Sequence, residues 1–196
     1  MIFHDRRHAG QLLAQRLQKY KNEDSIILAL PRGGVPIAAE IAKALGAPLD
    51  VLIVRKIGAP FQSELAVGAI CEDETEPIWN DPILYQMGLE PDHLGKIIRI
   101  EREKIKNQTK IFRGSRKFPS VVQKTVIIVD DGLATGATMS AAVKYLNKKG
   151  VGRIIIAVPV AAKNTSSHLR SKVDEVIVFE EREDLISVGQ WYEDFS

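Results

Sequence analysis

Two adjacent acids are the residues of this sequence best suited to chemistry. Asp130 and Asp131 directly follow 126–129, a run of four apolar and mostly β-branched residues. A run without polar alternation is typical of a strand covered on both faces, so we expect a central strand of a parallel sheet. The acids then emerge at its carboxyl end, the edge where open α/β sheets bind ligands. Because neighbouring carboxylates repel each other, they favour a cation or hydroxyl donors as partners.

A loop suited to phosphate follows the acids and leads into an expected helix over about 137–149. It offers backbone N–H groups, two hydroxyls and one glycine at a helix N-terminus, which together can hold a phosphate. These groups belong to Ala134, Thr135, Gly136, Ala137 and Thr138. The loop lacks the usual nucleotide-binding motifs. The acids beside it favour a sugar phosphate instead, because carboxylates accept hydrogen bonds from the sugar hydroxyls. The plain alternative is a strand-to-helix connection that binds nothing.

The segment VIIVDDGLATGATMS (126–140) resembles the 5-phosphoribosyl-1-pyrophosphate (PRPP) signature of type I phosphoribosyltransferases. That signature consists of four apolar residues, two acids and a T-G-x-T/S loop. The resemblance implies that Asp130 and Asp131 bind the 2′ and 3′ hydroxyls of ribose, and that residues 134–138 bind the 5′-phosphate. Gly132 departs from the pattern, because the family more often has a branched apolar residue there.

A second anion loop is expected near the N-terminus. Arg32, Gly33 and Gly34 follow an expected strand over 26–30 and precede an expected helix over 36–45. An arginine beside two glycines presents a guanidinium fork and unobstructed N–H groups to an anion. The stretch resembles the pyrophosphate loop of the family, although glycines are also ordinary turn residues.

Residues 58–68 are rich in glycine and polar residues and are predicted to form a mobile loop after a strand over 49–54. The resemblance implies a flexible lid over about 56–72 that closes on the reacting centre. Lys56 would neutralise the leaving pyrophosphate, or is simply a solvated charge. Glu64 would exchange a proton with the acceptor, or stabilise the lid.

The C-terminal VGQWY resembles the V-G-x-x-Y end of hypoxanthine-type enzymes. In those enzymes an aromatic residue three positions before the glycine stacks on the base, whereas this chain has Ile186 there. Trp191 is a candidate substitute, or packs the chain terminus as large aromatics usually do. Lys163 lies roughly where those enzymes keep a lysine that reads the base, so these residues are weak base-binding candidates.

Alternating apolar strands and amphipathic helices predict an α/β doubly wound, mostly parallel sheet. The resemblance implies the five-stranded phosphoribosyltransferase core over about 26–178. The 196 residues suit a single domain, in which helix 91–112 and segment 180–196 would form a small hood. The acids at 72–76 are expected to face solvent. A basic stripe on that helix is expected to be a solvated face or a subunit contact. The stripe consists of Arg99, Arg102, Lys106, Lys110 and Arg113.

Composition narrows the function classes. A formal net charge of +2 is too small to argue for nucleic acid by itself. The single cysteine, Cys71, excludes an intrachain disulfide and suits a reducing compartment. We expect Cys71 to be a small buried residue. No apolar run approaches ~18 residues, so the protein is expected in the cytoplasm.

The resemblance implies a phosphoribosyltransferase of nucleotide salvage that moves 5-phosphoribosyl from PRPP to a nitrogenous, nucleobase-like acceptor and releases pyrophosphate. It further implies a homodimer and a Mg²⁺ ion that Asp130 and Asp131 hold indirectly, through PRPP and water. The alternatives are a PRPP-binding regulator without turnover, possibly bound to nucleic acid through the basic stripe, and chemistry on another sugar phosphate.

Overall fold

The chain forms two compact units in the computed structural model, which describes residues 3–196 except the side chain of Glu64. The first unit comprises Met1–Val51, Phe118–Gly136 and Leu146–Ser196. The second unit comprises Leu52–Lys117 and Ala137–Tyr145. The two parts of the predicted hood therefore belong to different units: segment 180–196 lies in the first unit and helix 91–112 lies in the second.

The first unit is built on a five-stranded parallel sheet with the strand order β2-β1-β6-β7-β8. The strands are β1 (Ser25–Ala29), β2 (Leu49–Val51), β6 (Thr125–Val129), β7 (Arg153–Ala162) and β8 (Glu175–Arg182). The apolar run at 126–129 is completely buried in the central strand β6. Both the predicted fold class and the predicted central strand are thus confirmed.

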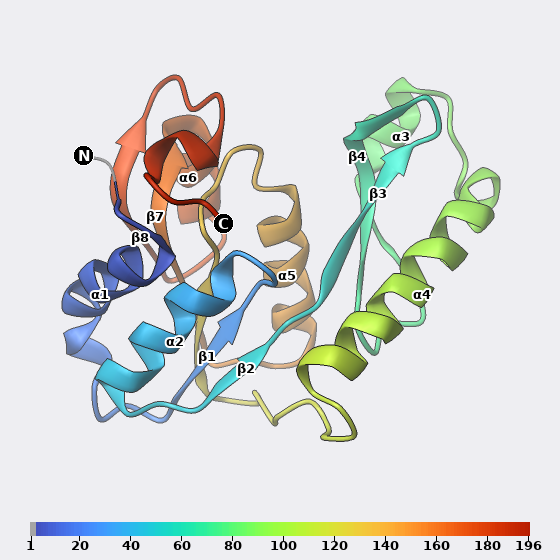
Figure 1. Ribbon diagram of the computed structural model, residues 1–196. Helices are drawn as coiled ribbons and strands as arrows, with labels where there is room; N and C mark the ends of the chain where they lie inside the picture. The colour runs from blue at the N-terminus through green and yellow to red at the C-terminus, as the bar shows by residue number, and fades with distance from the viewer. Residues whose placement is uncertain (1–2) are drawn as a thin grey trace. The chain divides into compact units, whose positions relative to one another are not determined.

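Helices cover this sheet and complete the first unit (Figure 1). They are α1 (Arg6–Arg16), η1 (Gln18–Tyr20), α2 (Gly34–Leu45), α6 (Lys163–Arg170) and η3 (Val188–Trp191), while α5 (Ala137–Lys148) crosses the boundary to the second unit. Asp5 caps α1, because its Oδ1 accepts from the N–H of His8 at 2.7 Å. Helices α1 and α2 approach closely at Gly10, where a Cβ would lie 2.8 Å from the carbonyl oxygen of Ile37.

The second unit contains a three-stranded antiparallel sheet with the order β3-β4-β5. Its elements are β3 (Val54–Ala59), β4 (Gln62–Cys71), β5 (Ile78–Trp79), α3 (Asp81–Gln86), η2 (Pro91–Leu94) and α4 (Gly95–Phe112). The prediction of a mobile loop over 58–68 is therefore wrong, because most of these residues belong to the β3–β4 hairpin. Polar residues occur there because one face of an antiparallel ribbon can stay in water. Gly58 permits the local bulge, since a Cβ would lie 2.4 Å from the carbonyl oxygen of Ser63.

A buried ion pair in the second unit corrects two further expectations. Glu72 was expected in solvent, and Arg113 on a solvated face or at a subunit contact. The two are only 3% and 5% exposed, however, and form an ion pair. Arg113 Nη2 donates to Glu72 Oε1 at 3.0 Å, and the N–H of Ile53 donates to the same oxygen at 3.0 Å. In the sequence, Glu72 belongs to an acidic stretch and Arg113 to a basic stripe, and both patterns predict exposed side chains. Neither pattern indicates that the two charges neutralise each other inside the unit.

Breaking this pair should destabilise the protein strongly. Arg113→Met leaves the carboxylate of Glu72 buried without its counter-charge, so we expect a loss of about 3 kcal/mol in the free energy of unfolding. Urea denaturation measures the loss, with the exposed Glu76→Gln as the matched control. The double variant Glu72→Met with Arg113→Met should recover much of it, because no charge is then buried. A loss for Arg113→Met no larger than for Glu76→Gln would contradict this role of the pair.

Candidate functional site

Asp130 and Asp131 lie directly after β6, half-buried at the carboxyl end of the central strand. Asp130 Oδ1 accepts from the N–H of Asp131 at 2.8 Å. Burial, and then the negative charge of Asp131, raise the pKa of the Asp130 carboxyl well above the ordinary range of an aspartate. A cation or hydroxyl donors at this edge would stabilise the ionised form, as the chemistry of paired acids predicts.

The loop after the acids is fastened along β7. The N–H of Leu133 donates to the carbonyl of Val160 at 2.9 Å, and the carbonyl of Leu133 accepts from Ala162 at 2.8 Å. Thr165 Oγ1 donates to the carbonyl of Ala134 at 2.6 Å. Gly136 has a φ of +68°, and a Cβ there would lie 2.5 Å from Thr165 Cγ2. These contacts hold residues 133–136 before α5 begins, and the binding of phosphate by residues 134–138 stays a prediction.

The structure explains the unusual Gly132. A Cβ at this position would come within 2.6 Å of Val188 Cγ1 and 3.1 Å of Val160 Cγ1. Val188 belongs to η3 near the C-terminus, so an apolar branched side chain from another part of the chain lies against this position.

The arginine–glycine loop lies beside the acids, because β1 and β6 are adjacent parallel strands. The N–H of Leu30 donates to the carbonyl of Val129 at 2.9 Å, and the peptide bond between Pro31 and Arg32 is cis. A Cβ on Gly33 would lie 1.8 Å from Asp131 Oδ2. Only glycine therefore permits this approach, and the structure brings the arginine–glycine loop and the acids together in the first unit.

Arg6 is a residue of this site that the sequence analysis missed. Its Nη2 and Nε donate to Asp131 Oδ2 at 2.9 and 3.1 Å. Tyr192 was missed as well, and its hydroxyl donates to the carbonyl oxygen of Asp131 at 2.7 Å. In the sequence Arg6 belongs to an ordinary amphipathic helix and Tyr192 to an aromatic terminus, so no local signal connects either residue with the acids.

The three base-binding candidates have contacts of their own in the first unit. Lys163 Nζ donates to Glu183 Oε1 at 2.6 Å. Trp191 is half-buried and packs on the apolar cluster that contains Phe3, while the guanidinium of Arg182 lies 4.4 Å from its ring centre. Ile186 is 83% exposed. These contacts favour a packing role for Trp191, and any base-binding role of the three residues remains a prediction.

The proposed lid residues belong to the second unit. Lys56 is half-buried in β3, and its neighbour Arg55 donates to Glu101 Oε2 at 2.8 Å. The backbone of Glu64 lies in β4, and its side chain is outside the described part of the structure. The catalytic roles of Lys56 and Glu64 therefore stay predictions.

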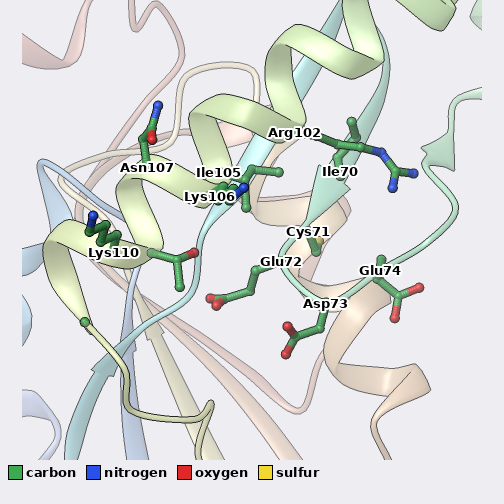
Figure 2. A pocket seen from close by; sticks show the side chains of 12 residues that line it. Ile70, Cys71, Glu72, Asp73, Glu74, Arg102, Ile105, Lys106, Asn107 and Lys110 are labelled. Atoms are coloured by element: carbon green, nitrogen blue, oxygen red, sulfur yellow. The ribbon is translucent and has the colours of Figure 1, made fainter.

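A cavity of about 610 Å³ in the second unit lies between the end of β4 and α4 (Figure 2). Three acids and three bases line it: Glu72, Asp73, Glu74, Arg102, Lys106 and Lys110. This balance of charge does not resemble the concentrated positive potential that favours phosphates. Cys71, which also lines the cavity, is 1% exposed, so its predicted burial is confirmed.

The donor set at the acids fits a metal held mainly by a ligand. Among the side chains that the structure describes, no group of three or more His, Cys, Asp and Glu is arranged to hold a metal ion. Asp130 and Asp131 alone would leave most coordination positions of a Mg²⁺ ion to water or phosphate oxygens, which is the coordination that this ion prefers.

In the part of the chain that the structure describes, no helix has both the length and the apolar character needed to cross a membrane.

The raised pKa of Asp130 predicts a pH dependence of stability. The folded protein favours the protonated carboxyl, so its contribution to stability is complete below the pKa of an unfolded aspartate, about 3.9. That contribution is lost as the pH rises toward the higher pKa of the folded state. Asp130→Asn should therefore match the wild type in acid and exceed it in unfolding free energy at alkaline pH. Urea denaturation from about pH 4 to about pH 9 measures the difference, with the exposed Asp184→Asn as control, and a difference independent of pH would contradict the assignment.

Comparisons with known proteins identify the family of this chain. The model of the phosphoribosyl transferase domain matches residues 3–190. A Mycobacterium tuberculosis protein provisionally named a phosphoribosyl transferase is 38% identical over 195 residues, which are 100% of this chain and 44% of that protein. The chain thus spans less than half the length of this relative. The crystal structure of TT1426 from Thermus thermophilus is 37% identical, with a TM-score of 0.85 over 100% of this chain and 92% of that one.

A more distant structure shares the fold alone. The purine phosphoribosyltransferase from Pyrococcus horikoshii is 21% identical, with a TM-score of 0.54 over 97% of this chain and 89% of that one. The family match covers nearly all of the chain, including both loops and both acids. The chain belongs to the phosphoribosyl transferase domain family.

Proposed function

We propose that this chain is a magnesium-dependent phosphoribosyltransferase, which moves 5-phosphoribosyl from PRPP to a nitrogenous, nucleobase-like acceptor and releases pyrophosphate. The observation that carries the proposal is the joint placement of two acids and two glycine-containing loops at the carboxyl edge of β1 and β6. Ligands of open α/β sheets bind at this edge. Family membership and the structural likeness to TT1426 support the assignment.

Each part of PRPP has a matching group in this proposal. Asp130 and Asp131 accept hydrogen bonds from the ribose hydroxyls, and residues 134–138 bind the 5′-phosphate through N–H groups and hydroxyls. Arg32, which is exposed, and the backbone of Gly33 and Gly34 bind the pyrophosphate. The close approach of Gly33 to Asp131 Oδ2 supports a common site, because it joins the pyrophosphate loop to the ribose acids.

The reaction breaks the bond between carbon 1 of ribose and a pyrophosphate oxygen, which leaves with the electron pair. The acceptor nitrogen forms the new bond to carbon 1 and gives up its proton to solvent or to a base. Carbon 1 carries positive charge in the transition state, so the protein must stabilise the departing anion and exclude water. Magnesium, when bound, would neutralise pyrophosphate charge, with Asp130 and Asp131 holding it through the ligand and water.

A regulatory role on nucleic acid has less support. Arg113 of the basic stripe is buried against Glu72, and Arg102 donates to the carbonyl of Thr75. The ion pair with Glu72 neutralises one of the five charges that the stripe would offer to a phosphate backbone, and the contact with Thr75 occupies part of the Arg102 guanidinium. The homodimer, nucleotide salvage and cytoplasmic location implied by the resemblance remain predictions.

PRPP should bind this protein with magnesium. Calorimetric titration should give tighter binding in the presence of Mg²⁺, and tighter binding of PRPP than of ribose 5-phosphate, which lacks the pyrophosphate. Asp130→Asn combined with Asp131→Asn should weaken binding by about 100-fold or more, because each lost charged acceptor costs about 1.5–3 kcal/mol. Asp184→Asn serves as the matched control. Failure of the wild type to bind either ligand would overturn the proposal.

Lys56 should act on turnover more than on binding. If it neutralises the leaving pyrophosphate, Lys56→Met should lower kcat by about tenfold or more, because removal of one donor to developing charge has effects of that order. Once a screen of purines, pyrimidines and amines has supplied an acceptor, steady-state kinetics would separate kcat from the KM for PRPP. Lys96→Met, at an exposed position of α4, is the control, and an unchanged kcat would assign Lys56 to solvation.

A further inference from the structure

Arg6 connects α1 to the acids and to the C-terminal segment within the first unit. The side chains of Arg6 and Asp131 are only 14% and 18% exposed. Two N–H groups of the guanidinium, at Nη2 and Nε, reach Asp131 Oδ2 at 2.9 and 3.1 Å. A pair so shielded from water is screened much less than a surface ion pair.

The second oxygen of Asp131 is the one left for a ligand. Oδ2 accepts from Arg6 twice, and it packs so closely on Gly33 that a Cβ there would lie 1.8 Å away. The contact with Gly33 and the guanidinium together fix the rotation of the carboxylate. Oδ1 is therefore the oxygen that can accept from a ribose hydroxyl.

The same guanidinium holds the C-terminal segment. Arg6 Nη1 donates to the carbonyl oxygens of Phe195 at 2.9 Å and Ser196 at 3.0 Å, and the guanidinium carbon lies 3.8 Å from the Phe195 ring centre. Tyr192 binds the carbonyl of Asp131 from the same segment. Arginine suits this position, because its planar fork donates in several directions while its face stacks on an aromatic ring.

We propose that Arg6 is a positioning residue of the PRPP site, which turns Asp131 so that Oδ1 meets a ribose hydroxyl and fastens residues 192–196 beside it. This inference rests on the proposed function. In this role Arg6 acts through Asp131, to which it donates two hydrogen bonds. Its effect should therefore be on the ribose part of the ligand and not on the pyrophosphate part.

The test compares PRPP with inorganic pyrophosphate in calorimetric titrations with Mg²⁺. Arg6→Gln should weaken PRPP binding by about tenfold or more, since it removes charged hydrogen bonds to Asp131, and should leave pyrophosphate affinity unchanged. The PRPP affinity of Arg6→Lys should lie between those of the wild type and Arg6→Gln, because an ammonium restores the positive charge but not the planar fork of donors. Arg7→Gln is the matched control, since the side chain of Arg7 is 75% exposed and forms only a long ion pair, 3.9 Å from Arg7 Nη1 to Glu40 Oε1.

The outcomes separate the two proposals. Wild-type binding of PRPP with equal affinities for Arg6→Gln and Arg7→Gln would overturn the role of Arg6 and leave the proposed function standing. Equal losses for PRPP and pyrophosphate would show a general disturbance and also overturn the role. If Arg6→Gln does not fold, Arg6→Lys decides by the same comparison. No binding of PRPP by the wild type would overturn both proposals.

Discussion

The contact between the carboxylate of Asp131 and the backbone of Gly33 is the constraint on which the ligand-facing edge of the first unit depends. It exists because β1 and β6 are adjacent and parallel, so the loops that follow them emerge at the same edge. A side chain at Gly33 would occupy the place of Asp131 Oδ2. The acid pair therefore packs against backbone. The positive charge of Arg6 offsets only part of the repulsion between the acids, because the pKa of Asp130 stays raised.

The parts of the fold that depend on local sequence could be predicted. The apolar run at 126–129 is long enough, and free enough of polar residues, to identify the buried strand β6. The carboxyl end of that strand then places Asp130 and Asp131 at the ligand edge, since parallel strands share that geometry. The glycines of both loops are found where the backbone must approach something closely. The family and fold class followed from these same residues, and both were confirmed.

Long-range electrostatics could not be predicted in the same way. The partner of Arg6 lies 125 positions further along the chain, and that of Glu72 lies 41 positions away. Charged side chains at such positions look solvated in a sequence, because nothing local reveals the opposite charge that offsets the cost of burial. The β3–β4 hairpin was missed for a related reason. Its polar residues and Gly58 indicate a loop, whereas the pairing of two strands supplies the order.

Gly132 and Val188 share one volume. Val188 of η3 fills the space that a side chain at position 132 would occupy. A larger side chain at one of these positions therefore requires a smaller one at the other. A branched residue at 132 would require a small one at 188, and the reverse holds for this chain. The consequence is evolutionary: substitutions at position 132, after the acids, and at position 188, near the C-terminus, should be correlated. In relatives with this arrangement, the summed volume of the two side chains should vary less than either volume alone.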